Sequence, residues 1–219
     1  MMKKMMMIAA MMVATLTASA QRSVIEPGQF GLQPKVGLNL SQITSDDTKF
    51  KAGLAAGFEG QYQVNNWFAL TLGVMYEQQG TAVKITDAMR SLGLEKAKAN
   101  LEYLNIPVMA RFYVAKGLSL GVGLQPGFLT KAKQSVEGQG WNVDNDGDIK
   151  DACNKFCLAV PVSISYELPF GLTFDARYTM GVNDTAKEDK NGNTGNSWNN
   201  YYDGKNSVIQ LTVGYKFGF

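Results

Sequence analysis

The last eleven residues of the chain alternate between apolar and polar or glycine positions. Ile209, Leu211, Val213 and every second residue up to Phe219 are apolar. A period of two predicts a β-strand with one face in an apolar medium and the other in a polar medium. Eleven residues is also the length that a tilted strand needs to cross a bilayer. This feature favours a fold in which strands meet lipid.

The amino terminus has the pattern of a Sec signal peptide. Lys3 and Lys4 precede an apolar stretch that runs to about Ala18, and Ala18-Ser19-Ala20 forms a small-x-small cleavage site before Gln21. A membrane anchor is the alternative, but the apolar run is shorter than the ~20 residues that a spanning helix requires. We therefore predict a signal peptide over 1–20, a short N-terminal segment over 21–29 and a barrel domain over 30–219.

The net charge gives no support to nucleic-acid binding. Without the two leader lysines, 19 basic residues face 19 acidic ones. Nucleic-acid binding proteins usually carry a clear basic excess.

Alternation recurs along the whole chain, and it predicts an all-β fold made of one eight-stranded antiparallel up-and-down transmembrane β-barrel. The outward apolar residues define the expected strands as 32–40, 54–64, 68–76, 104–114, 118–128, 158–168, 172–180 and 209–219.

The expected connections alternate between tight and long. The tight turns are Asn65-Asn66, Ala115-Lys116-Gly117 and Pro169-Phe170-Gly171, and the long polar stretches are Thr44–Phe50, Gly80–Asn100, Lys133–Asn154 and Asn183–Asn206. Short periplasmic turns with long extracellular loops are typical of outer-membrane barrels. A soluble β-sandwich would not separate its loop lengths in this way.

The inward face of the expected barrel carries charges of both signs among small residues. The predicted lumen charges are Lys35, Arg111, Arg177, Lys216, Glu59, Glu167 and Asp175. The interior of an eight-stranded barrel is just wide enough for side chains to fill. Buried charges persist when they are paired, so we expect a salt-bridged plug that includes Glu167, Asp175, Arg111 and Lys216. An ion-selective pore is the alternative, although it usually needs one sign of charge to dominate.

Aromatic residues bunch near both ends of the expected strands, as in the two girdles of a membrane barrel. Those near the short turns include Tyr62, Trp67, Phe112, Tyr166, Phe170 and Phe217, and those near the loops are Tyr76, Phe128 and Tyr178. Pro107, Pro126 and Pro161 fall inside expected strands, where each removes a hydrogen-bond donor. Bulges near them would resolve this conflict, and the sequence alone does not show whether they are present.

Several motifs resemble those of an outer-membrane β-barrel family that is common in Bacteroidota, the PorT-like group. Glu102-Tyr103-Leu104-Asn105-Ile106-Pro107-Val108 is similar to the family's "YLEIPL" signature, and the likeness extends to 121–127, 175–182 and 211–217. The resemblance covers about residues 30–219 and implies a small barrel of the OmpA/OmpX type. Ending on an aromatic also resembles such barrels, and it implies recognition of the C-terminal strand by the barrel-assembly machinery. Phe156-Cys157-Leu158-Ala159 departs from the family's usual "FDFG".

No catalytic, cofactor-binding or metal-binding residues are predicted. The chain contains no His, which serves as the base in outer-membrane lipid A deacylases and acyltransferases and in hydrolytic Ser–His arrangements. Asp144–Ile149 resembles the opening of a calcium loop. However, Ile149 stands at the sixth position, where such loops have glycine, and Lys155 stands at the twelfth, where they have a bidentate glutamate. A solvated acidic loop is the simpler interpretation.

The two cysteines, Cys153 and Cys157, lie four residues apart. An oxidising periplasm favours a disulfide, but a straight strand would separate them by about 13 Å, too far to bridge. A disulfide therefore requires a backbone turn between them, and the sequence leaves the question open.

The leading functional hypothesis is a non-enzymatic outer-membrane barrel whose long loops act in envelope structure or surface recognition. The alternatives are a narrow porin or transporter, and a PorT-like accessory of type IX protein secretion. Expected partners are outer-membrane lipid and lipopolysaccharide, and no nucleic acid is expected. The sequence does not indicate which molecule the extracellular loops bind.

Overall fold

The computed structural model describes residues 25–43, 48–83, 90–91, 93–138, 141–150, 153–185 and 204–218. The predicted signal peptide, Phe219 and most of the predicted loop from Asn183 to Asn206 lie outside these residues. No helix within them is long and apolar enough to cross a membrane.

The described residues form twelve β-strands. In chain order they are β1 (Phe30–Ile43), β2 (Thr48–Lys49), β3 (Lys51–Gln63), β4 (Phe68–Val83), β5 (Leu94–Asn105), β6 (Val108–Ala115), β7 (Leu118–Gly138), β8 (Trp141–Asp148), β9 (Phe156–Glu167), β10 (Leu172–Asp184), β11 (Lys205–Tyr215) and β12 (Phe217–Gly218).

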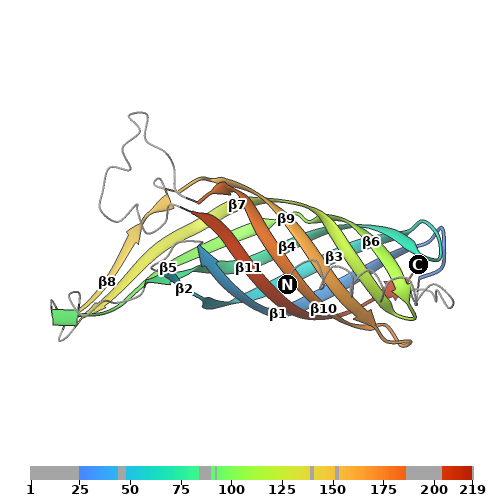
Figure 1. Ribbon diagram of the computed structural model, residues 1–219, viewed down its shortest axis with the longest axis horizontal. Coiled ribbons are helices and arrows are strands. Elements are labelled where there is room, and N and C mark those ends of the chain that lie inside the picture. The colour runs from blue at the N-terminus through green and yellow to red at the C-terminus, as the bar shows by residue number, and fades with distance from the viewer. Residues whose placement is uncertain are drawn as a thin grey trace, which may run out of the picture.

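These strands build a closed barrel with eight antiparallel wall positions. Each wall strand pairs with its neighbours in the chain, and β1 pairs with β11 from Lys35↔Gly214 to Ile43↔Asn206, which closes the sheet on itself (Figure 1). β5 and β6 occupy one wall position, as do β11 and β12, because each pair keeps a single register with its neighbours. The predicted fold class is confirmed.

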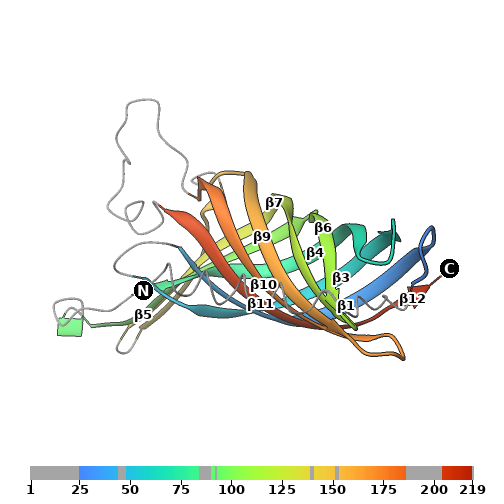
Figure 2. The ribbon, with the colours of Figure 1, turned by 45° about the vertical axis from the view of Figure 1, so that its right-hand side comes forward.

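The short turns lie where the sequence predicted them. Asn65 caps the first, because its Oδ1 accepts hydrogen bonds from the amides of Trp67 at 3.0 Å and Phe68 at 2.9 Å. Gly117 and Gly171 adopt φ of +71° and +95° in the other two, a region that favours glycine. All three turns lie at the end of the barrel that also holds the C terminus (Figure 2).

The three prolines do not shift the register of the described ladders, so the conflict that the sequence left open is not resolved by bulges at these positions. Pro107 lies in the break between β5 and β6, where its carbonyl accepts from Gly73 N at 2.8 Å. Ile106 N likewise donates to Pro126 O at 2.8 Å. Pro161 faces Thr179 in an unbroken β9–β10 register. The nearest shift lies at Glu102/Tyr103.

The predicted long loops at Gly80–Asn100 and Lys133–Asn154 are largely strand instead. β4 continues to Val83, β5 begins at Leu94, and the β5–β7 ladder extends to Leu94↔Gly138. β8 adds a further hairpin strand against β7. The polar composition misled the prediction, because a strand outside the membrane needs paired backbone groups but not apolar side chains. The result is a sheet that projects beyond the barrel at one end (Figure 1).

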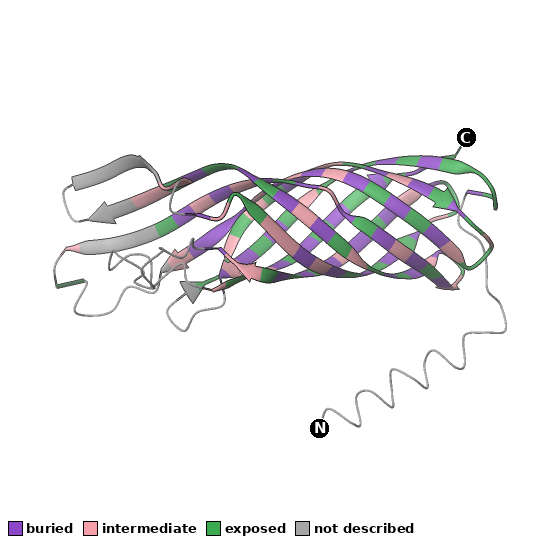
Figure 3. Cartoon of the chain, turned by 90° about the horizontal axis from the view of Figure 1, so that it is seen from above, coloured by how far each residue is buried: buried purple, intermediate pink, exposed green. Residues whose placement is uncertain are grey.

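The barrel is apolar outside and polar inside. Outward Leu38 and Leu72 are 62% and 58% exposed, whereas inward Glu59 and Arg177 are 1% and 2% exposed. Buried and exposed positions alternate along the wall strands where burial is described (Figure 3). Exposed aromatic pairs mark both ends of this apolar belt, with Phe30 against Tyr62 at the short-turn end and Phe128 against Phe156 at the other. This is the arrangement expected of a barrel in lipid.

Candidate functional site

The most elaborate site in the barrel is its lumen, and Glu59 of β3 lies at its centre. One carboxylate oxygen accepts from Arg111 Nη2 at 3.0 Å, and the other accepts from Arg177 Nη2 at 3.0 Å. Lys35 Nζ lies 3.3 Å from the second oxygen. The four side chains come from four different strands, and all are buried. Glu59 therefore ties several walls of the barrel together.

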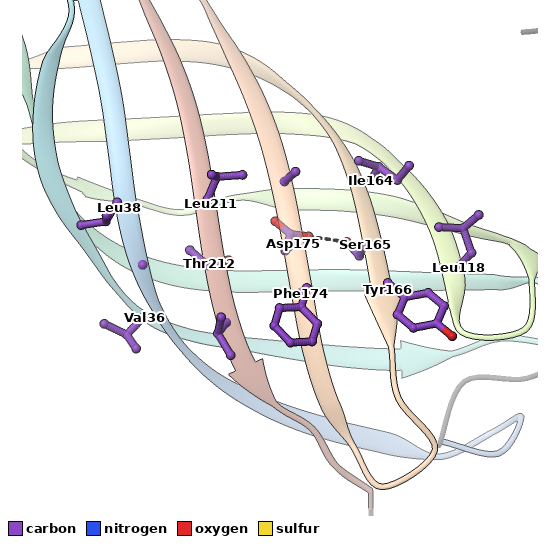
Figure 4. Close-up of a pocket in the computed structure, with 13 residues that line it drawn as sticks. Val36, Leu38, Leu118, Ile164, Ser165, Tyr166, Phe174, Asp175, Leu211 and Thr212 are labelled. Carbon is purple, nitrogen blue, oxygen red and sulfur yellow. Dashed lines mark hydrogen bonds between the residues drawn. The ribbon is translucent and has the colours of Figure 1, made fainter.

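Asp175 supplies a second carboxylate to the same group. Its Oδ2 lies 3.6 Å from Arg111 Nη2, and its Oδ1 lies 3.6 Å from Arg177 Nε. Ser165 donates a hydroxyl hydrogen bond to it and accepts one from Arg111 Nη1 at 2.5 Å. Figure 4 shows Ser165 on β9 and Asp175 on β10, with the outward residues Tyr166 and Phe174 next to them on the same strands.

A second polar group lies nearer the short turns, around Lys216. Its ammonium lies 2.5 Å from Glu167 Oε2, 2.9 Å from Gln61 Oε1 and 3.1 Å from the Tyr113 hydroxyl. Tyr113 in turn donates to Glu167 at 3.2 Å. Lys216 occupies the interruption between β11 and β12, so this group anchors the C-terminal strand to the opposite wall.

All seven lumen charges predicted from the sequence are buried in the barrel. The predicted network of Glu167, Asp175, Arg111 and Lys216 is divided, however, because one ion pair joins Arg111 to Asp175 and a separate one joins Lys216 to Glu167. Among the residues that the structure describes, Glu59 has more ion-pair partners than any of these four, namely Lys35, Arg111 and Arg177.

Sequence reasoning missed an eighth lumen charge, Glu77 of β4. Glu77 is 2% exposed and accepts from Gln79 Nε2 at 2.7 Å. Its position could have been found, since it continues the inward series of Thr71 and Met75 on the same strand. With Glu77, the fully buried charged side chains of the described lumen are four basic and four acidic ones, so neither sign dominates as it would in a pore selective for one sign of charge.

An apolar residue closes the lumen at the short-turn end. Ile25 is 1% exposed and packs against Gly31, where an added Cβ would lie 2.0 Å from Ile25 Cδ1. The segment is held by Gly28 N, which donates to Gln63 O at 2.7 Å, and by Gln63 N, which donates to Gln29 O at 3.1 Å. No sequence pattern predicted this closure, because Ile25 precedes the first strand and follows no periodic pattern.

A larger apolar cluster closes the opposite end. It consists of the buried residues Ile43, Ala99, Leu101, Tyr103, Leu129, Ala132 and Cys153. Directly below it, Asn105, Gln125 and Asn206 line a cavity of about 10 Å³, and each has a polar atom without a hydrogen-bond partner. That volume suits one water molecule. An ion would have to lose its hydration to pass these apolar ends, which is costly.

Both cysteines belong to this end of the barrel and are free thiols. Cys153 is buried in the apolar cluster, and Cys157 packs against the same cluster. The chain bends at Lys155 between them, as a disulfide would require.

The acidic run at Asp144–Asp148 lies in β8 rather than in a loop. Among the residues that the structure describes, no group of three or more His, Cys, Asp or Glu side chains is placed to hold a metal ion.

The outer wall carries a groove of about 590 Å³ between β1, β11, β10 and β9, lined by outward apolar side chains such as Val36, Leu38, Phe174 and Leu211 (Figure 4). Its position on the lipid-facing surface makes it part of the membrane contact.

The sequence from residue 18 to residue 187 matches the family model of the outer membrane protein beta-barrel domain. The chain belongs to this family. Membership agrees with the apolar belt and polar lumen, and it places the protein in the outer membrane.

Solved structures with a similar fold are small outer-membrane barrels. Ail, the attachment invasion locus protein of Yersinia pestis, is 16% identical with a TM-score of 0.49, over 87% of this chain and 99% of that chain. Neisserial surface protein A is 14% identical with a TM-score of 0.47, over 86% and 97%. OprG of Pseudomonas aeruginosa is 12% identical with a TM-score of 0.39, over 91% and 99%. These likenesses concern the fold alone. No curated protein matches the sequence.

Proposed function

We propose that the protein is a non-enzymatic barrel with a closed lumen, which acts in envelope structure or surface recognition through the sheet that projects beyond the membrane. The observation that carries the proposal is the Glu59 centre, in which one carboxylate binds Lys35, Arg111 and Arg177 inside the barrel. A lumen filled in this way serves as a rigid support, and it leaves the extension as the surface available to partners outside the cell.

The direction of the extension supports this proposal. It lies at the end opposite the three short turns, which in outer-membrane barrels face the periplasm (Figure 1). The proposal includes export by the Sec signal peptide at 1–20 and recognition of the C-terminal strand by the barrel-assembly machinery.

Shortening the extension tests the role in recognition. The pairs Ala82↔Lys98 and Gln134↔Gly147 can each be closed by a two-residue Asn-Gly turn. The shortened protein should insert normally and show heat-modifiable migration. Cells that carry it should nevertheless resemble the deletion strain in their surface proteome and in their attachment to surfaces. If the shortened protein, at equal membrane yield, restored the wild-type surface proteome and attachment, a role for the extension would be refuted.

A narrow porin or transporter is the second candidate, and unpaired polar atoms in the lumen favour it. Arg177 Nη1, Glu77 Oε1 and Gln210 Oε1 are buried without a hydrogen-bond partner. Water at these atoms would give a partly hydrated lumen. Conductance in planar bilayers separates this candidate from the closed barrel.

The PorT-like signature at Glu102–Val108 supports a third candidate, an accessory of type IX secretion in a member of the Bacteroidota. Deletion of the gene should then reduce secretion of surface cargo, and normal secretion by the deletion strain would remove this candidate.

A further inference from the structure

Strand β7 carries a β-bulge at the point where the extension leaves the barrel wall. Glu102 of β5 lies opposite Lys131. The next residue of β5, Tyr103, lies opposite Leu129, so Thr130 is one extra residue on β7. The Thr130 hydroxyl donates to Glu102 O at 2.8 Å, which fixes the extra residue in place. A bulge of this kind bends its strand and increases the local twist of the sheet.

A glycine on the other side of β5 bends the sheet at the same level. Gly80 of β4 lies opposite Asn100 of β5 and has a φ of +132°, in a region that favours glycine. A Cβ at this position would lie 2.0 Å from Ala99 O. Asn100 and Glu102 are two residues apart on β5. The irregularities at Gly80 and Thr130 therefore form one line across β4, β5 and β7, which is called the rim bend.

Side chains beyond the rim bend belong to the apolar cluster that closes this end of the lumen. Ala99 of β5 and Ala132 of β7 lie on the extension side of the bend, and both are buried in the same cluster as Ile43. Ile43 is the last residue of β1. Strand β1 lies four wall positions from β7 in either direction around the barrel, and so directly across from it. The cluster therefore spans the mouth of the barrel, and the extension supplies one side of it.

The bulge adds one residue to β7 without changing which side chains face the lumen. Leu129 before the bulge and Ala132 after it are both buried, whereas Thr130 and Lys131 between them are both exposed. Two successive outward side chains are what one extra residue produces in an alternating strand. Removal of Thr130 would therefore restore strict alternation and leave the other residues of β7 on their present faces.

The segment before β9 is attached to the rim bend and helps to cover the mouth. Lys150 Nζ donates to Thr130 O at 2.9 Å, and Ile149 N donates to Ala132 O at 3.1 Å. Cys153 of the same segment is buried in the cluster. The bulge thus supports this segment as well as the extension.

We infer that the extension also serves as the lid of the lumen, and that the rim bend holds this lid closed. The bend directs the inner face of β5 and β7 toward Ile43 on the opposite wall. An extension that ran straight on from the wall would separate Ala99 and Ala132 from Ile43 and leave the polar cavity beneath them uncovered. A partner that straightened the extension would then open the barrel from outside. That link to a partner rests on the proposed function, whereas the lid itself does not.

Deletion of Thr130 tests the inference, since it removes the bulge and keeps the neighbouring strand pairs. The two thiols serve as native reporters, because Cys153 lies in the cluster and Cys157 packs against it. After mild reduction, their reaction with a membrane-impermeant maleimide is followed on the purified full-length barrel in phospholipid nanodiscs. Thr130→Ala is the matched control, because it keeps the extra residue and its carbonyl and loses only the hydroxyl. Heat-modifiable migration checks that each variant is folded.

The wild type should react slowly, and deletion of Thr130 should raise the labelling rate at least about tenfold, because local opening governs access to a buried group. Thr130→Ala should stay within about threefold of the wild type. Rapid labelling of the wild type, or equal rates in the wild type and the deletion variant, would overturn the inference.

A second pair of variants tests the rim bend even if the deletion variant does not fold. Gly80→Ala places a Cβ against Ala99 O at the bend and should also raise the labelling rate. Gly57→Ala introduces a similar clash, 2.1 Å from Val74 O, in the barrel wall below the mouth and should leave the rate unchanged. Equal rates in these two variants would contradict a lid held by the rim bend. Because labelling needs no partner, the result does not depend on whether the extension serves in recognition.

Discussion

Arg177 of β10 donates a hydrogen bond of 3.0 Å to Glu59 of β3, a residue 118 positions earlier in the chain. Strands β11 and β1 lie between these two in the wall, so the bond crosses the interior of the barrel. Both side chains are almost fully buried. Neither charge has access to bulk water, and each depends on the other for its stability.

Removal of the Glu59 charge should therefore destabilise the barrel strongly. Glu59→Gln leaves Lys35, Arg111 and Arg177 with Asp175 as the nearby carboxylate, and breaking a buried ion pair typically costs about 3–5 kcal/mol. Urea unfolding in lipid vesicles measures the change. Glu102→Gln is the control, because its partly exposed ion pair with Lys131 contributes at most about 1 kcal/mol. Equal unfolding midpoints for the two variants would contradict the central role of Glu59.

Adjacent residues of β11 point to opposite sides of the wall, so substitutions at Val213 and Thr212 should differ in their effect on stability. Val213 is 42% exposed on the outer wall, midway between the outward residues Ile209 and Phe217, whereas Thr212 is 4% exposed in the lumen. Val213→Arg should cost roughly 2–4 kcal/mol because it puts a charge into lipid. Thr212→Val should be nearly neutral, since the Thr212 hydroxyl has no hydrogen-bond partner. Refolding yield into bilayers tests both changes, and an unaffected Val213→Arg protein would show that this face does not meet lipid.

The closure at the short-turn end can be tested through Ile25. Ile25→Ala removes the side chain that fills the space beside Gly31, so the amides of Gly28 and Gln63 should exchange with solvent at least about tenfold faster. Nuclear magnetic resonance in nanodiscs measures both amides. Leu32→Ala changes an exposed residue on the outer face of the neighbouring strand and should leave them protected. Unchanged exchange in Ile25→Ala would mean that Ile25 does not hold the segment in place.

The C-terminal strand should direct assembly in the outer membrane. Phe217 pairs with Leu32 and is 46% exposed, and replacement of Phe217 and Phe219 by Ser should lower membrane yield while export continues. Phe170→Ser removes an even more exposed aromatic from a short turn and should have little effect. Normal yield and heat-modifiable migration of the double variant would argue against this role.

Alternation allowed the wall strands and seven lumen charges to be predicted, because lipid outside and a polar lumen inside require a period of two. The pattern assigned Lys35 and Arg177 to the lumen without knowledge of their partners. Partner choice could not be predicted, since it depends on how the strands are staggered around the barrel. That stagger brings Glu59 rather than Glu167 to Arg111 and Arg177.

Features outside the membrane escaped prediction for a different reason. The extension at β5, β7 and β8 is held by backbone hydrogen bonds, so its polar residues carry no apolar period. Ile25 lies ahead of the first strand and packs against Gly31, a contact that no periodic pattern records. Glu77 was predictable in principle, because its place on β4 follows from the inward position of Met75.

Single-channel recording of the wild type and of Arg111→Ala is the most direct test of the closed lumen. Arg111 binds Glu59 and lies near Asp175, so its removal leaves buried carboxylates with fewer partners and should cost about 3–5 kcal/mol in urea unfolding. The account predicts that the wild type conducts little, and that the variant is less stable and conducts more as water enters the lumen. Steady, ion-selective conductance by the wild type, together with unchanged stability of Arg111→Ala, would contradict the closed lumen and establish a pore.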